Sequence, residues 1–144
     1  MSIKIHRISF AQDTTLPSRE DKAANDLQKR FENDLEQYKN AKGDIYILTS
    51  IRIFGQKRDD VDILVVGLLE NFTIKSVQTK NYDHLDELII KSFIANIELK
   101  SHPSTDVFHE GTDYIVKYSN CKENASQQCR EAKFSLFNHN TPTI

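Results

Sequence analysis

The chain has 144 residues, few glycines and prolines, many charges and a formal net charge of −2. We therefore expect one domain with an ordinary hydrophobic core, and the slight negative charge argues against tight, autonomous binding to nucleic acid. The longest apolar run, residues 63–69, is too short to cross a bilayer, and the first residues lack the apolar core of a signal peptide. We predict a cytoplasmic protein that does not contact membranes.

The first part of the chain predicts a strand followed by a helix. Residues 1–7 alternate between polar and apolar in the manner of a strand. Ser18 and Asp21 have capping-box spacing, and the helix that they begin should run to about residue 39. Glu20 falls on the apolar stripe of this helix, where its carboxylate either interacts favourably with the helix N-terminus or belongs to a site. The stripe consists of Ala24, Leu27, Phe31, Leu35 and Tyr38.

Three strands are predicted next. Residues 45–54 form one long β-branched strand, 55–60 a polar turn, and 61–67 a second strand that is apolar on both faces except at Asp62. Residues 72–77 alternate like a third, more exposed strand. Residues 81–87 are expected to form a polar loop or a short helical turn.

The segment 89–100 predicts a strand that is buried on both faces and ends in Glu98-Leu99-Lys100. Side chains alternate along a strand, so Glu98 and Lys100 share one face. A carboxylate and an ammonium placed there are costly unless they pair or bind something. The same Glu-x-Lys pattern at 20–22 and 131–133 lies in helical stretches, where residues i and i+2 point apart.

The last part of the chain predicts a loop at 101–111, a short strand at 113–118 and a helix from about Asn124. Gln128 lies at the border of that helix's apolar stripe. The cysteines and histidines do not have zinc-ligand spacing. The chain then stops without a closing element, as the N-terminal piece of a longer protein would.

Asp62, Glu98 and Lys100 are thus unusual polar residues on apolar elements. If their strands are antiparallel neighbours, the start of one lies beside the end of the other, and Asp62 comes within reach of Glu98. Two carboxylates at that distance repel each other unless a divalent cation lies between them. Oxygen ligands suit Mg²⁺ or Mn²⁺, and the carbonyl of Leu99 could add a third ligand.

This arrangement resembles the PD-(D/E)xK nuclease superfamily, and most closely the nuclease-related domains of the NERD type. The matching segments are Asp60-Val61-Asp62 at a strand start, Glu98-Leu99-Lys100 at a strand end, and Asn124-Ala125-Ser126-Gln127-Gln128, which keeps the family's spacing but not its proline. The resemblance covers about residues 18–138 of a single nuclease-like domain spanning 1–144. It implies an α/β, restriction-endonuclease-like fold with a central mixed β-sheet flanked by helices. It also implies an inserted strand or hairpin at about 72–80, because the segment between the motifs is long.

The resemblance implies a Mg²⁺-dependent endonuclease acting on DNA, with RNA as an open alternative. Asp62 and Glu98 would hold the metal ion, which polarises the scissile phosphate and acidifies a water molecule. Lys100 would position or deprotonate that water and offset charge on the phosphate. Defence against foreign DNA and an attached or associated helicase are the implied setting.

Further site residues follow from the same resemblance. Gln128 would orient Lys100, the water or the phosphate, and Glu20 would match a glutamate that the first helix of such domains contributes. Lys57 and Arg58, in the turn before the second long strand, are candidate nucleic-acid phosphate contacts.

Two other interpretations stay open. The first is a catalytically inactive nucleic-acid-binding or assembly module of the same fold, with which the missing proline, the insertion and the mild acidity are compatible. The second is an ordinary α/β domain in which Glu98 and Lys100 form a surface ion pair of little energetic weight.

Overall fold

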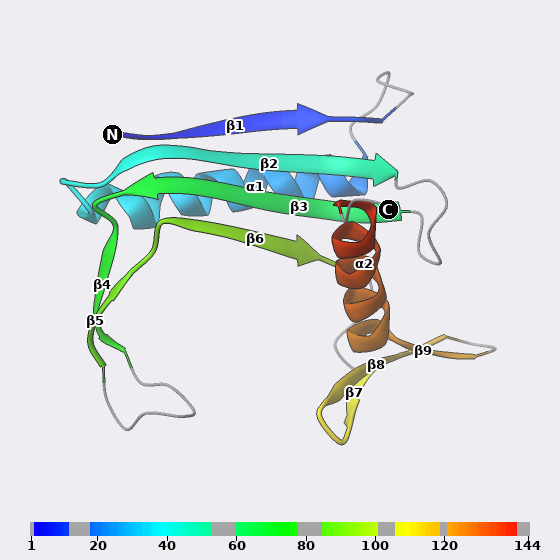
Figure 1. Cartoon of the computed structure of the whole chain (residues 1–144). Helices are drawn as coiled ribbons and strands as arrows, with labels where there is room; N and C mark the ends of the chain where they lie inside the picture. Colours follow the sequence, from blue (N-terminus) through cyan, green and yellow to red (C-terminus); the bar gives the residue numbers. More distant parts are fainter. Residues whose placement is uncertain are drawn as a thin grey trace.

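The computed structural model describes residues 2–11, 18–52, 60–77, 85–100, 106–118 and 121–140. It is a mixed α/β structure (Figure 1). No described helix has both the length and the apolar character needed to span a membrane. The elements in chain order are β1 (Ile3–Ser9), α1 (Arg19–Asp34), a 3₁₀ turn η1 (Leu35–Gln37), β2 (Lys42–Arg52), β3 (Asp60–Glu70), β4 (Thr73–Val77), β5 (Leu85–Ile89), β6 (Ser92–Ile97), β7 (Val107–Glu110), β8 (Asp113–Lys117), β9 (Lys122–Asn124) and α2 (Ala125–Asn140).

The main sheet has four strands in the order β1-β2-β3-β6. β1 pairs with β2 in parallel, whereas β2 with β3 and β3 with β6 are antiparallel. β2 and β3 have 11 residues each and are rich in isoleucine, valine and leucine, whose branched or bulky side chains pack well on a pleated surface. The predicted central mixed sheet flanked by helices is therefore confirmed.

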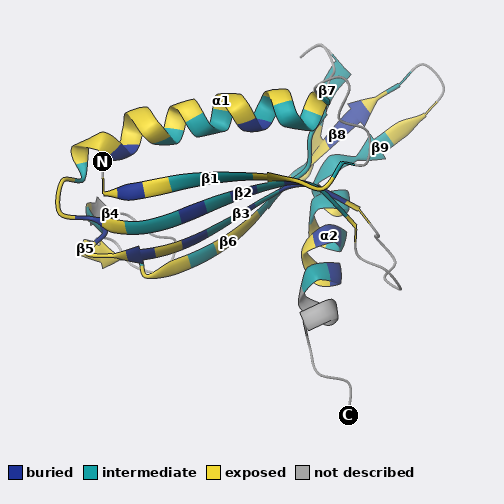
Figure 2. Ribbon diagram, turned by 90° about the horizontal axis from the view of Figure 1, so that it is seen from above, coloured by how far each residue is buried: buried dark blue, intermediate teal, exposed yellow. Residues whose placement is uncertain are grey.

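α1 covers one face of this sheet, and α2 lies on the opposite face (Figure 2). The predicted capping box is confirmed, because the Ser18 side chain accepts from the Asp21 backbone and the Asp21 side chain accepts from the Ser18 backbone. The α-helix ends at Asp34 and continues as the 3₁₀ turn. The hydrophobic core lies between α1 and the sheet. Its fully buried members include Ile3, Ala24, Ile45, Ile47, Ile63 and Val65.

Two smaller sheets extend from the main one. β4 and β5 pair as antiparallel strands, so a strand pair begins where an inserted strand or hairpin was expected, near residues 72–80, and it extends to residue 89. β7, β8 and β9 form a three-stranded antiparallel sheet beside the start of α2 (Figure 1). The final helix begins where predicted, since the Asn124 side chain accepts a hydrogen bond of 2.8 Å from the Gln127 backbone N–H.

Three expectations about the strands were wrong. Residues 85–87, expected in a loop or helical turn, belong to β5, and residues 107–110, expected in a loop, form β7. Both segments are short and partly polar, so only their pairing with β4 and β8 makes them strands. The expected strand over 89–100 is also shorter, because β6 covers only Ser92–Ile97.

β6 is not buried on both faces as predicted. Among the described residues its sheet neighbour is β3 alone, so β6 is an edge strand. The Ile94 side chain, on the face that α2 covers only in part, is 69% exposed. An apolar run in the sequence therefore did not indicate full burial.

Candidate functional site

The start of β3 and the end of β6 lie side by side, as predicted. Their antiparallel register pairs Ile63 with Ile97 at the last rung, so the next rung would place Asp62 opposite Glu98. The strand pairing ends before that rung. Instead, the Leu99 backbone N–H donates a 2.8 Å hydrogen bond to Asp62 Oδ2. The Asp62 carboxylate therefore contacts the peptide group that links Glu98 to Leu99.

The opposite neighbour of Asp62 on β2 is Ser50, which has a left-handed backbone with φ of 58°. The pairs on either side, Thr49 with Ile63 and Ile51 with Val61, are regular, but no pair is formed between Ser50 and Asp62. A positive φ is uncommon for a residue other than glycine and often marks a functional or strained position. The strand pair is thus irregular at the rung that holds Asp62.

The side-chain alternation reverses at this rung. Ile63 packs in the core beneath α1, yet Val61, two residues away, packs against Ala132 and Leu136 of α2. In a regular strand the side chains of Val61 and Ile63 would share a face. Because of this reversal, Asp62 does not share the face of Leu64, as it would in a regular strand.

Asp62 lines a small pocket of about 170 Å³ together with Glu20, Asp60 and Arg52. Glu20 comes from the first turn of α1, and its side chain is 20% exposed. The structure therefore brings the predicted Glu20 and Asp62 to one pocket.

Glu98 and Lys100 meet just beyond the end of β6. Lys100 Nζ lies 3.3 Å from Glu98 Oε1, and the two side chains are 19% and 7% exposed, respectively. They form a largely buried ion pair and not the exposed surface pair of the simplest interpretation. A buried pair requires good geometry and further hydrogen bonds to offset the desolvation of both charges.

Glu123, at the centre of β9, supplies those further hydrogen bonds. Its Oε2 accepts from Lys100 Nζ, from the Tyr118 hydroxyl and from Gln128 Nε2, each at 3.2 Å. The donated bonds from Gln128 and Lys100 lower the pKa of Glu123. Sequence reasoning missed this residue.

The charges around Lys100 stabilise its ammonium form. Burial alone would lower the pKa of Lys100, but the hydrogen bonds to Glu123 and Glu98 outweigh it and raise the pKa. Burial, and then the bond to Glu123, raise the pKa of Tyr118. The predicted Gln128 reaches Lys100 through Glu123, and its buried Oε1 has no hydrogen-bond partner among the residues that the structure describes.

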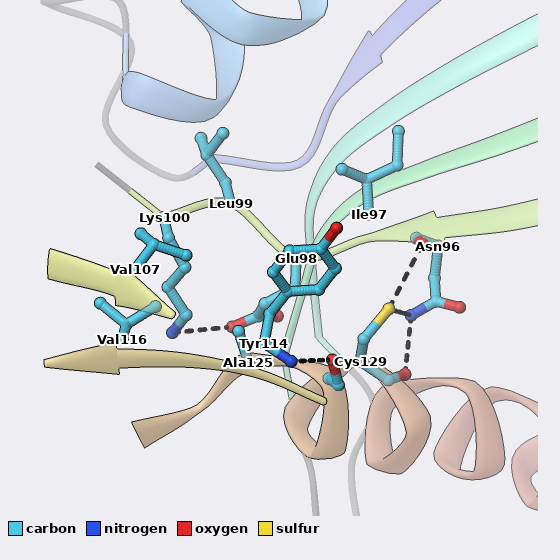
Figure 3. A pocket seen from close by; sticks show the side chains of 11 residues that line it. Asn96, Ile97, Glu98, Leu99, Lys100, Val107, Tyr114, Val116, Ala125 and Cys129 are labelled. Atoms are coloured by element: carbon cyan, nitrogen blue, oxygen red, sulfur yellow. Dashed lines mark hydrogen bonds and ion pairs between the residues drawn. The ribbon is translucent and has the colours of Figure 1, made fainter. Parts of the chain in front are cut away.

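A larger cavity of about 580 Å³ opens beside the Glu98–Lys100 pair. Its walls come from the end of β6, from β7 and β8, and from the first turn of α2 (Figure 3). Tyr114, Val107 and Val116 form part of the apolar lining. Figure 3 shows Lys100 pointing toward Glu98 at one end of this cavity.

The predicted site residues therefore fall into two groups that meet at Asp62 and Leu99. Glu20 and Asp62 line the small pocket, whereas Glu98 and Lys100 line the large cavity and Gln128 lies behind them. The Leu99 N–H donates a hydrogen bond to Asp62, whereas the Leu99 carbonyl oxygen is the atom predicted as a metal ligand. Residues 57 and 58, the predicted phosphate contacts Lys57 and Arg58, lie outside the described residues.

Asp62, Glu98 and the Leu99 carbonyl carry oxygen donors of the kind that a hard divalent cation accepts, but Asp62 and Glu98 line different pockets. In the described part of the chain, no three or more Asp, Glu, His or Cys side chains are grouped to hold a metal ion. Asp62, Glu98 and the Leu99 carbonyl would supply two carboxylates and one further oxygen. Mg²⁺ commonly accepts such a set, because it keeps several waters and binds through one or two carboxylates.

No protein-family model matches the chain, and neither a curated protein nor a solved structure is significantly similar to it. A function for the chain must therefore be argued from the chemistry of this junction.

Proposed function

We propose that the chain is a metal-dependent nuclease with a restriction-endonuclease-like fold and a PD-(D/E)xK-type site, which cleaves phosphodiester bonds of DNA. One observation supports this most. The Asp62 carboxylate accepts the amide of Leu99, and Leu99 lies between the paired Glu98 and Lys100. Asp62 of β3 thus contacts the backbone of the segment that carries Glu98 and Lys100, although Asp62 and Glu98 line different pockets. The mixed sheet between two helices is consistent with such a fold.

In this proposal Asp62 and Glu98 hold a Mg²⁺ ion with help from the Leu99 carbonyl. When bound, the ion would polarise the phosphate and acidify a water molecule. Lys100 lies between Glu98 and Glu123, and its positive charge would offset the negative charge that develops on the phosphate.

The surrounding residues would keep Lys100 in place and bring the substrate to it. Glu123 holds the ammonium from the side of β9, and Gln128 holds Glu123. The net charge of −2 gives the chain little attraction to nucleic acid, so an attached or associated motor such as a helicase would deliver the substrate. Defence against foreign DNA is a setting in which such an enzyme would act, and RNA is the alternative substrate.

The test is nicking of supercoiled plasmid in Mg²⁺ compared with EDTA. Asp62→Asn and Glu98→Gln should each lower the rate by at least about 100-fold, because each removes a charge that would act on the transition state. Glu20→Gln should have a milder effect. Glu70→Gln, an exposed acid at the far end of β3, is the matched control and should cut normally.

A second readout does not depend on activity. Mn²⁺ binding, followed by electron paramagnetic resonance, should weaken in Asp62→Asn and Glu98→Gln but not in Glu70→Gln. Unchanged cutting by Glu98→Gln would contradict the mechanism. Binding of nucleic acid without any cutting by the wild-type chain would instead favour the inactive module.

A further inference from the structure

The 580 Å³ cavity beside Lys100 is lined by both charged and apolar side chains. Val107 and Val116 lie beside Lys100, and the Tyr114 ring lies next to Glu98 (Figure 3). Its volume falls within the range of about 300–1,000 Å³ that is typical of ligand pockets. An apolar cavity next to charged groups suits a ligand that is itself part apolar and part charged.

Tyr114 presents an aromatic surface at this cavity. The residue is 52% exposed, which is high for a large ring that lines a pocket. Its position is nevertheless fixed. The Tyr114 backbone N–H donates a 2.8 Å hydrogen bond to Ser126 Oγ of α2, and its ring packs against His109 with the ring centroids 4.2 Å apart. A held, half-exposed ring is suited to stacking against a flat ligand.

The charge of the cavity favours a neutral ring beside Tyr114. Lys100 is already bonded to Glu98 and Glu123, so two carboxylates balance its charge and the cavity does not favour an anionic group. Valine side chains offer no ligand to a cation. A nucleobase is flat and uncharged, and the phosphate attached to it would be held at the proposed metal site.

We propose that this cavity binds an unpaired nucleobase of the strand whose phosphate lies at Lys100. The inference rests on the proposed nuclease function and adds a substrate class: single-stranded, frayed or flap-containing nucleic acid. A base inside a duplex is paired and stacked on both sides, and it must leave the stack before Tyr114 can stack on it. Tyr114 would stack on the base, in a way that tolerates any sequence.

The test is equilibrium binding of a short single strand with a central 2-aminopurine, in Ca²⁺ in place of Mg²⁺ to prevent cutting. The chain has no tryptophan, so the fluorescence of the base can be excited without interference from the protein. Affinity is measured by anisotropy, and stacking by quenching of 2-aminopurine. A strand with an abasic position in place of 2-aminopurine, and the matching duplex, are measured in parallel.

Wild-type protein should bind the strand with the base about 5- to 150-fold more tightly than the abasic strand, the range that one stacked base supplies. Tyr114→Ala should remove this difference and the quenching, whereas Tyr114→Phe should keep both. Phe134→Ala, which removes a 61% exposed ring of α2 that does not line the cavity, is the matched control and should behave like wild type.

Equal binding of the base-containing and abasic strands by the wild-type protein would overturn the inference, and this comparison needs no variant that could fail to fold. Duplex bound as tightly as single strand, with no quenching, would also overturn it. Plasmid nicking separates the two proposals. Nicking without any base preference would support the nuclease and contradict the base site. Stacking without nicking would support the base site and contradict the nuclease.

Discussion

Replacing Lys100 with methionine should destabilise the fold by about 3–5 kcal/mol. Methionine keeps much of the lysine volume but removes the ammonium that lies 3.3 Å from Glu98 Oε1. At an effective dielectric constant of about 20, two unit charges at that distance attract by about 5 kcal/mol. The Glu98 side chain is only 7% exposed, so water can replace little of this interaction.

The partner substitution should cost less. Glu98→Gln leaves Lys100 bonded to Glu123, whose side chain is 38% exposed and remains charged. We expect a cost of about 1–2 kcal/mol for Glu98→Gln. The double variant should be more stable than the sum of the single effects predicts, by about 1–3 kcal/mol, because the two residues are directly coupled.

The measurement is urea or thermal unfolding of the wild type, the two single variants and the double variant. For a chain of this length, a loss of 3–5 kcal/mol corresponds to a fall in Tm of roughly 6–20 °C. Lys122→Met is the matched control, since Lys122 forms a 4.0 Å pair with Glu110 in which both side chains are about 60% exposed. It should change stability by no more than about 0.5 kcal/mol. If Lys100→Met cost as little as Lys122→Met, the reasoning about the buried pair would be refuted.

Three other predictions concern regions outside this pair. Hydrogen bonds from Arg130 hold the pKa of Asp113 at about 2, below its ordinary 3.8, so its stabilisation is complete above 3.8 and is lost as the pH falls toward 2. Asp113→Asn should therefore have a flatter Tm profile over that acid range, and parallel profiles would contradict this. Gly43→Ala should cost about 2–4 kcal/mol in urea unfolding, because φ is 135° there and a Cβ would overlap the Leu68 carbonyl oxygen. Ser18→Ala should remove the helix cap and cost about 1 kcal/mol by calorimetry, whereas Ser18→Thr should keep most of it.

Local signals in the sequence predicted much of the fold. The Ser18–Asp21 box determines where α1 begins through bonds between residues three apart, so no knowledge of the tertiary structure is needed. The long β-branched runs of β2 and β3 are equally local. β5 and β7 could not be predicted in this way, because they are strands only through their pairing with β4 and β8.

In the candidate site, too, local features could be predicted from the sequence and features set by tertiary structure could not. Glu98 and Lys100 are two residues apart and meet as predicted, although both lie beyond the end of β6 and not in the strand that the prediction assumed. That Asp62 lies beside this segment required the correct strand order, which the antiparallel hypothesis supplied. Asp62 lines one pocket with Glu20 at the rung where Ser50 has a left-handed backbone, and an ordinary serine in a β-rich run gives no sign of that irregularity.

Glu123 could not be identified from the sequence for a different reason. It lies in a three-residue strand with no apolar periodicity, and what brings it to Lys100 is its pairing with Val116 across the small sheet. That sheet therefore has a specific role in the proposed site. It supplies the carboxylate that holds Lys100 and, through Tyr114, a wall of the cavity that we assign to a base. The sequence predicted only a loop at 101–111 and a short strand at 113–118 between the Glu-x-Lys strand and the last helix. In the folded chain, the strands of this region supply both charged and apolar side chains to the site.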